Sequence, residues 1–293
     1  ILLAAVAAAV AGGARGREVR MLKRPVGGSA ESLPVIGLGS WITFDIEAEA
    51  DLADARDTLR GFVDGGGSVV DSSPMYGRAE SVVGNLAGDL DVANGLFLAT
   101  KVWTEGREAG IRQMQQSLRR LRRDRIDLMQ VHNLVDARTH LPTLHAWKDA
   151  GRIRFWGLSH YHKGAHSEME GCMRYELPHF IQINYSMAEP EAGQRLLPLA
   201  AQMGVPVIAN RPFAEGALFR RVQGRALPPW AGELGIATWA QFFLKWIIGD
   251  AAVTCVIPAT RRATHVADNL AAGAGPVPSA AERLRMARFL RDA

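Results

Sequence analysis

The sequence is poor in cysteine. Only Cys172 and Cys255 occur among its 293 residues, and they show no metal-ligand spacing. Two cysteines cannot build a disulfide framework, so a disulfide-stapled fold is excluded and a zinc module is not indicated. Cys255 lies in the apolar run 253–257, where we interpret it as a small buried hydrophobe and expect no bridge to Cys172.

The chain also lacks a hydrophobic run long enough to cross a membrane. Residues 1–10 are Ile-Leu-Leu followed by Ala and Val, but ten residues are too few to span a bilayer, so we expect no stable membrane insertion. This run is similar to the apolar part of an export signal, or is an ordinary Ala-rich extension. We therefore separate residues 1–20 from 21–293. Both the cytoplasm and the periplasm, reached by the twin-arginine route, remain open.

The charge is modestly basic and scattered. The net charge is +4, with 34 Lys and Arg against 30 Asp and Glu. The one basic cluster, residues 119–125, contains no aromatic side chain and follows a predicted helix. We interpret it as a solvated helix end, where cations suit the helix dipole, and not as a nucleic-acid site.

Short apolar runs alternate with amphipathic stretches from residue 35 onward. The predicted strands are 35–39, 68–71, 97–101, 126–132, 153–159, 180–184, 206–211 and 252–258. The predicted helices include 51–63, 110–121, 236–248 and, at the C-terminal end, 277–290. Strands separated by helices form parallel sheets, and eight such units close a barrel.

No linker rich in Pro, Gly or Ser divides the chain, which favours one α/β domain. An open doubly wound sheet is the alternative architecture, but a dinucleotide-binding sheet of that kind typically has a Gly-x-Gly-x-x-Gly turn after the first strand. Residues 37–41 are Gly-Leu-Gly-Ser-Trp, with no third glycine in place. The sequence therefore predicts a single (β/α)8 TIM barrel with an extra C-terminal helix.

Four residues with acid–base chemistry lie at or just beyond the ends of three successive predicted strands. Asp71 and Tyr76 follow one strand, Lys101 ends the next and His132 ends the third. The carboxyl ends of the strands carry the chemistry of such barrels. An ammonium beside Tyr76 would lower the pKa of the phenol, Asp71 would hold Lys101 protonated, and His132 would orient a carbonyl oxygen. Each residue alone would more often be structural, whereas the set of four predicts catalysis.

The motifs around these residues resemble the aldo-keto reductase superfamily. They are Asp-Ser-Ser-Pro-Met-Tyr-Gly (71–77), Ala-Thr-Lys-Val-Trp (99–103), Gln-Val-His-Asn (130–133), Gly-Leu-Ser (157–159), Gln-Ile-Asn-Tyr-Ser (182–186), Ile-Pro (257–258) and Asp-Asn (268–269). The resemblance covers nearly all of the chain from residue 33 onward. It implies a barrel that binds NADPH in an extended form, with Asp71, Tyr76, Lys101 and His132 as the catalytic tetrad.

The resemblance also implies the residues that bind the cofactor. Ser159, His160, Gln182 and Asn184 would lie near the nicotinamide amide, and Tyr185 would stack on the ring unless it is a core aromatic. Arg211 would line the pyrophosphate path. Pro258, Thr260, Arg261, Arg262, Asp268 and Asn269 would bind the adenosine end.

The adenosine segment departs from the pattern of many relatives. Those relatives have Lys-Ser after the proline and a later arginine, where this chain has Ala259, Thr260 and His265. Arg261 and Arg262 offer guanidinium groups for a 2′-phosphate instead, unless they only form a solvated helix start. NADPH is therefore expected over NADH.

The substrate side is less defined by sequence. Trp41, Trp103 and Phe213 are expected to wall an apolar pocket for a small carbonyl substrate, with plain packing as the alternative. An NADPH-dependent reductase of aldehydes and ketones is the favoured function. An NADPH-binding regulatory subunit with weak catalysis, and a barrel enzyme of unrelated chemistry such as a hydrolase, remain as alternatives. The sequence does not define an oligomeric state.

Overall fold

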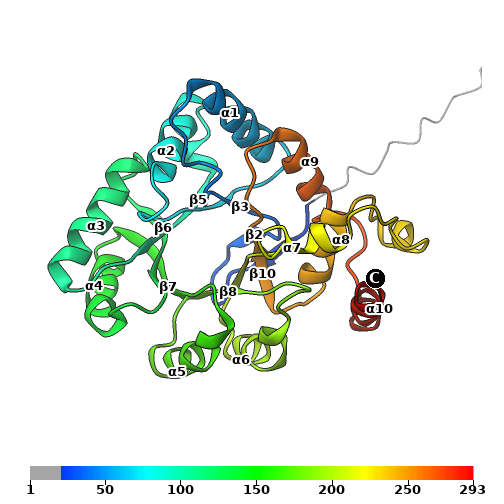
Figure 1. Cartoon of the computed structure of the whole chain (residues 1–293). Coiled ribbons are helices and arrows are strands. Elements are labelled where there is room, and N and C mark those ends of the chain that lie inside the picture. The colour runs from blue at the N-terminus through cyan, green and yellow to red at the C-terminus, as the bar shows by residue number, and fades with distance from the viewer. Residues whose placement is uncertain (1–20, 293) are drawn as a thin grey trace, which may run out of the picture.

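The computed structural model describes residues 21–292, so the predicted N-terminal segment 1–20 lies outside the described residues. A short antiparallel hairpin comes first, formed by β1 (Lys23–Pro25) and β2 (Ser32–Pro34). An eight-stranded parallel sheet follows, with the strands in sequence order. Helices surround the sheet, as Figure 1 shows.

The strands of the barrel match the predicted ones closely. They are β3 (Leu38–Gly39), β4 (Val69–Asp71), β5 (Phe97–Val102), β6 (Ile126–His132), β7 (Ile153–Ser159), β8 (Phe180–Asn184), β9 (Val207–Asn210) and β10 (Val253–Val256). Parallel bridges from Ile36 to Val256 and from Gly39 to Ala259 join the first strand to the last. The predicted (β/α)8 barrel is confirmed.

The helices cover the outside of the barrel. They are α1 (Glu49–Asp64), α2 (Ala79–Asp89), α3 (Arg107–Arg120), α4 (Ala137–Asp149), α5 (His166–Glu176), α6 (Leu196–Met203), α7 (Ala217–Arg221), α8 (Trp239–Ile248), α9 (Ala263–Ala271) and α10 (Ala280–Arg291). The last of these is the predicted C-terminal helix. A capping box between Ser279 and Glu282 begins it.

The interior of the barrel is apolar toward its N-terminal end. A cluster of buried side chains there contains Val26, Leu33, Val69, Phe97, Ala99, Leu128, Phe180, Ile208, Cys255 and Ile257. Val26 and Leu33 come from the β1–β2 region, which the sequence did not predict, so the hairpin closes this end of the barrel. Cys255 is buried and both cysteines are free thiols.

Strand alternation explains how polar groups reach the other end. Side chains two residues apart on a strand share a face. Asp71 therefore follows Val69 into the interior, Lys101 follows Ala99, and Gln182 follows Phe180. The apolar layer thus lies beneath a layer of polar side chains at the carboxyl ends of the strands.

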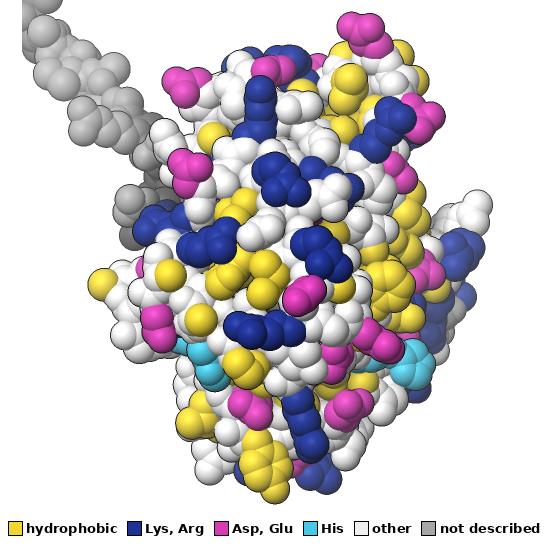
Figure 2. Space-filling view, turned by 90° about the vertical axis from the view of Figure 1, so that its left-hand side faces the viewer, with side chains coloured by type: hydrophobic (Ala, Val, Ile, Leu, Met, Phe, Trp, Pro, Cys, Tyr) yellow, Lys and Arg dark blue, Asp and Glu magenta, His cyan; other side chains and the backbone are white. Residues whose placement is uncertain are grey.

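The predicted basic cluster lies at the end of α3. Arg120 forms an ion pair with Glu80 at 3.4 Å, and Arg123 donates a hydrogen bond to the Ala93 carbonyl. Figure 2 shows the side of the molecule where α3 and α4 lie, with cationic and acidic side chains interspersed. These contacts support the interpretation of the basic cluster as a helix end.

No helix within residues 21–292 is long and apolar enough to cross a membrane.

The contact between α2 and α3 depends on Gly84. A Cβ at this position would lie 2.3 Å from the Arg120 carbonyl oxygen. Alanine normally favours a helix over glycine by about 1 kcal/mol, but here we expect Gly84→Ala to destabilise the protein by about 1–3 kcal/mol through overpacking. Gly171→Ala in α5, where a Cβ meets nothing within 4 Å, should stabilise the protein. Urea unfolding of both variants measures the change in the free energy of unfolding. Equal changes in Gly84→Ala and Gly171→Ala would contradict the close contact between the two helices.

Candidate active site

A buried ion pair forms the base of the site. The Lys101 Nζ lies 2.7 Å from the Asp71 Oδ2, and the side chains are 0% and 3% exposed. Lys101 also donates to the Ser72 carbonyl at 2.7 Å. Burial alone would lower the pKa of Lys101, but Asp71 and Tyr76 outweigh burial and raise it. The ammonium therefore remains charged.

The second carboxylate oxygen of Asp71 accepts hydrogen bonds from two side-chain amides. Gln182 donates to Oδ1 at 2.8 Å and Gln130 donates at 3.3 Å. The carboxylate is thus fixed by donors from three strands, β5, β6 and β8. This arrangement satisfies a charge that would otherwise be costly to bury.

Tyr76 lies on the loop after β4, facing the ion pair. The Lys101 Nζ is 5.0 Å from the centroid of the Tyr76 ring, and the His132 ring meets it edge-on at 6.5 Å. Burial raises the pKa of Tyr76, while the charge of Lys101 lowers it. The expected effect of Lys101 is present, but burial outweighs it, so the phenol holds its proton at neutral pH.

His132 is a neutral imidazole at neutral pH. Burial, aided by Lys101 and His160, lowers the pKa of His132 to about 3. Its Nδ1 lies 2.8 Å from the Ser159 Oγ, which leaves Nε2 for the cavity. Ser159 is expected beside the nicotinamide amide, and in the structure its hydroxyl holds the orientation of His132.

A cavity of 840 Å³ opens above these residues. Its floor contains Asp71, Tyr76, His132 and Gln182, and its walls include the three predicted aromatic residues, Trp41, Trp103 and Phe213. Arg211 lines it as well, with a guanidinium nitrogen 3.4 Å from the Glu215 carboxylate.

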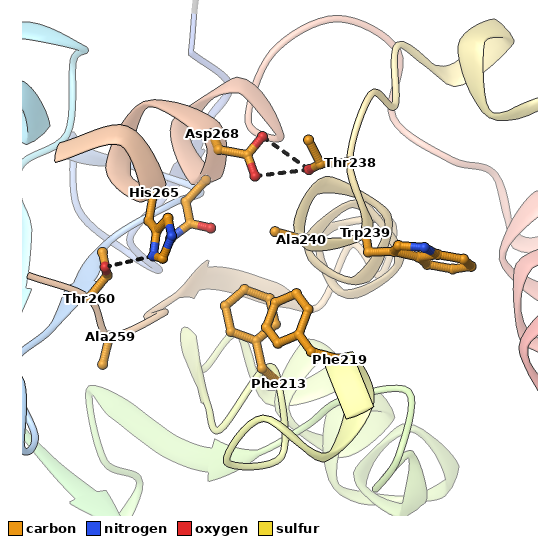
Figure 3. A pocket seen from close by; sticks show the side chains of 10 residues that line it. Phe213, Phe219, Thr238, Trp239, Ala240, Ala259, Thr260, His265 and Asp268 are labelled. Carbon is orange, nitrogen blue, oxygen red and sulfur yellow. Dashed lines mark hydrogen bonds between the residues drawn. The ribbon is translucent and has the colours of Figure 1, made fainter. Parts of the chain in front are cut away.

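A second cavity of 370 Å³ continues from the first. The two share Phe213, Phe219 and Ala259. Figure 3 shows the second cavity, with Thr260 and His265 on one side and Thr238 with Trp239 on another. Asp268 accepts hydrogen bonds from Thr238 at 2.9 and 3.0 Å. The predicted residues Thr260, Asp268 and Asn269 all line this cavity, so an elongated path runs from Tyr76 to α9.

Three predicted adenosine-end residues do not line that cavity. Arg261 forms an ion pair with Asp51 of α1 at 3.0 Å. Arg262 is exposed and precedes the first residue of α9. Pro258 is buried in the barrel wall, where its carbonyl accepts from the Gly39 amide at 3.0 Å.

The structure corrects the expectation for Tyr185. Its ring is 2% exposed and packs on Trp246 at 5.0 Å, and its hydroxyl contacts Asp250 and Arg283. Gln182 faces the interior, and Tyr185 is three positions further on, so alternation turns it outward toward α8. Tyr185 is thus a core aromatic and does not reach the cavity.

Asn184 and His160 also lie away from the cavity wall. The Asn184 amide donates to Glu189 at 2.8 Å, and its oxygen is 3.0 Å from the His166 Nε2. The His160 Nδ1 accepts from the amides of Tyr161 and His162. Both side chains order the loops around the mouth of the cavity. Both were expected near the nicotinamide amide, but neither lines the cavity.

Several cavity residues were not predicted from sequence. Tyr161, Asn210 and Phe219 line the larger cavity, and Thr238 with Trp239 lines the smaller one. Tyr161 follows β7, Asn210 ends β9, Phe219 belongs to α7, and Thr238 and Trp239 form the start of α8. Tyr161 and Asn210 lie next to the predicted residues His160 and Arg211, but nothing about these five residues themselves indicates a role, so only the fold reveals them.

Comparisons with known proteins agree with this geometry. The model of the aldo/keto reductase family matches residues 35–281, so the chain belongs to this family. It is an oxidoreductase that acts on carbonyl compounds, which excludes the hydrolase alternative.

Several relatives are similar to this protein over most of the chain. Methylglyoxal reductase YeaE of Escherichia coli is 28% identical, covering 82% of this chain and 85% of the relative. A probable voltage-gated potassium channel subunit beta of Arabidopsis thaliana is 25% identical, covering 86% and 91%. The structure of an aldo-keto reductase from Klebsiella pneumoniae in complex with NADPH is 28% identical, with a TM-score of 0.77 over 92% of this chain and 96% of that one.

The lowered pKa of His132 predicts a pH dependence of stability. Its folded value of about 3 lies below the ordinary value of 6.5, so between these pH values the unfolded chain binds a proton that the folded chain does not. Stability should fall as pH drops below 6.5, by up to about 1.4 kcal/mol per pH unit from this group. Denaturation between pH 7 and 4 should show a shallower fall for His132→Gln. Parallel curves for the two proteins would contradict a buried neutral imidazole.

Proposed function

We propose that this protein reduces aldehydes and ketones to alcohols with NADPH, and that Tyr76 is the proton donor. The observation that carries the proposal is that Asp71, Tyr76 and His132 line the floor of one cavity. The buried Lys101 lies beneath that floor, paired with Asp71 and 5.0 Å from the centroid of the Tyr76 ring. A proton donor, a cation and a neutral hydrogen-bond donor around one point can stabilise the negative charge that develops on a carbonyl oxygen during reduction.

Each residue has a distinct task in this mechanism. The neutral His132 donates from Nε2 to the carbonyl oxygen and orients it. Tyr76 gives its proton to that oxygen as negative charge develops there. Lys101, held charged by Asp71, stabilises the phenolate that Tyr76 becomes. The same groups serve the reverse reaction, because proton transfer through Tyr76 is reversible.

The two joined cavities fit an extended dinucleotide. Their combined path runs from the floor at Tyr76 to the polar groups of α9, past the shared aromatic residues Phe213 and Phe219. Gln182 would hold the nicotinamide end, Arg211 the pyrophosphate, and Thr260, Asp268 and Asn269 the adenosine. When bound, NADPH supplies the hydride for the carbonyl carbon.

The preference for NADPH over NADH rests on the start of α9. Arg261 is paired with Asp51, whereas Arg262 forms no ion pair within residues 21–292. An unpaired guanidinium beside the helix N-terminus suits a phosphate. Arg262 is therefore the proposed contact for the 2′-phosphate.

A regulatory subunit with slow catalysis is the second candidate. The likeness to a potassium channel subunit beta favours it, because that relative matches over most of both chains. The complete set of acid–base residues favours the reductase. Turnover on carbonyl substrates separates the two candidates.

Substitution of Tyr76 tests the reductase directly. Tyr76→Phe removes the proton donor and keeps the ring, so kcat should fall by about 10²–10⁴-fold. The Kd for NADPH should be unchanged, and NADPH should bind more tightly than NADH in both proteins. Tyr175→Phe, at a surface tyrosine that is 87% exposed, is the matched control and should retain wild-type kinetics. NADPH oxidation and fluorescence titration measure both quantities, and a fully active Tyr76→Phe would overturn the mechanism.

A further inference from the structure

The loop after β3 contains a strained turn. Ile42 has a φ of +62°, and the Thr43 amide donates to the Trp41 carbonyl at 2.7 Å. This i to i+2 hydrogen bond across a positive φ makes a γ-turn of the rare, strained kind. A β-branched residue is among the least suited to such a backbone, and glycine would adopt it without strain.

Contacts on both sides of Ile42 enforce this turn. Ser40 donates to the Asp71 carbonyl from its amide at 3.0 Å and from its hydroxyl at 2.9 Å. Phe44 is fully buried and its amide donates to the Ser40 carbonyl at 3.1 Å. Asp45 accepts from the Arg78 amide at 2.9 Å. The turn is thus tied to the end of β4 at Asp71 and to the loop that carries Tyr76, and strain of this kind persists only where surroundings impose it.

Packing does not explain the side chain at this position. Ile42 is 64% exposed, so it contributes little to the core, and it lines the mouth of the larger cavity beside Trp41. Three further non-glycine residues with positive φ, Asn133, Arg211 and Glu215, line the same cavity. Four of the ten non-glycine residues with positive φ in the described part of the chain therefore line this one cavity, and strain held at such a site bears on function.

The rim around Ile42 is apolar. Exposed large apolar side chains that line the cavity are Trp41, Ile42, Met75, Trp103, Tyr161 and Phe219. Such a patch around a cavity marks a binding surface for an apolar group.

We propose that Ile42 is a specificity-determining residue. The enforced turn fixes its side chain at the cavity mouth, where it contacts the apolar group of the substrate and favours bulky apolar carbonyl compounds over small polar ones. This inference rests on the proposed reductase function, with the carbonyl group on the floor at Tyr76 and the rest of the substrate toward the rim.

Two substitutions separate the side chain of Ile42 from its backbone strain. In the NADPH-bound protein, Ile42→Gly and Ile42→Ala should each lower the ratio of kcat/KM for 2-naphthaldehyde to that for methylglyoxal by about ten-fold. Ile42→Gly should also raise Tm by about 2 °C, because glycine relieves the strain, whereas Ile42→Ala keeps a Cβ in the turn and should not.

Leu177 provides a matched control. It also has a positive φ, +49°, and is 65% exposed, but it follows α5 and does not line the cavity. Leu177→Gly should leave the substrate ratio at the wild-type value. An unchanged ratio in the Ile42 variants, or the same loss in Leu177→Gly, would overturn the proposal.

Calorimetric binding distinguishes this inference from the proposed function. If the wild-type protein binds 2-naphthaldehyde without turning it over, the reductase proposal fails. About ten-fold weaker binding to Ile42→Gly would still support the role of Ile42. Equal binding to the two proteins, or none to the wild type, would overturn that role.

Discussion

The buried ion pair between Lys101 and Asp71 is the interaction on which the site depends. Both charges lie at the top of an otherwise apolar barrel interior, and each has further polar partners. Loss of either partner would leave an uncompensated buried charge, at a cost of about 3–5 kcal/mol. The pair therefore fixes the position of the ammonium beside Tyr76, and it couples three strands through the amides that hold Asp71.

The surrounding groups adjust the protonation of the site in different directions. Burial keeps the proton on Tyr76 and keeps His132 neutral, while Asp71 keeps Lys101 charged. A proton donor, a neutral hydrogen-bond donor and a fixed cation thus meet in one small space. Around them, loops that contain residues with positive φ, Ile42 among them, line the cavity. The proposed chemistry and the proposed selectivity therefore belong to different parts of the same site.

The barrel was predictable from sequence because short apolar runs alternate with amphipathic helical stretches. The floor of the site was predictable because its polar residues lie at the ends of those runs. Asp71 and His132 end β4 and β6, and Lys101 is the last residue but one of β5, which places all three at the carboxyl end of the barrel. The alternation of side chains along β8 turns Tyr185 outward, since it lies an odd number of residues from Gln182. The family resemblance placed Tyr185 on the nicotinamide ring, and that prediction was wrong because alternation decides which way the side chain points.

Other features depend on contacts between distant residues. The β1–β2 hairpin has strands of only three residues, too short for a periodic signal. Nothing near Arg261 in the sequence indicates its ion pair with Asp51. The strain at Ile42 depends on the hydrogen bonds of Ser40 and Asp45 to other segments and on the burial of Phe44. Such features come from tertiary structure and cannot be read from local pattern.

Transfer of deuterium from the cofactor tests the central claim most directly. The protein is mixed with NADPH that carries deuterium at both C4 positions and with 2-naphthaldehyde, and the product is analysed by mass spectrometry. The account predicts one deuterium on the former carbonyl carbon of the alcohol. An alcohol without deuterium, or no alcohol from protein that binds the nucleotide, would contradict it.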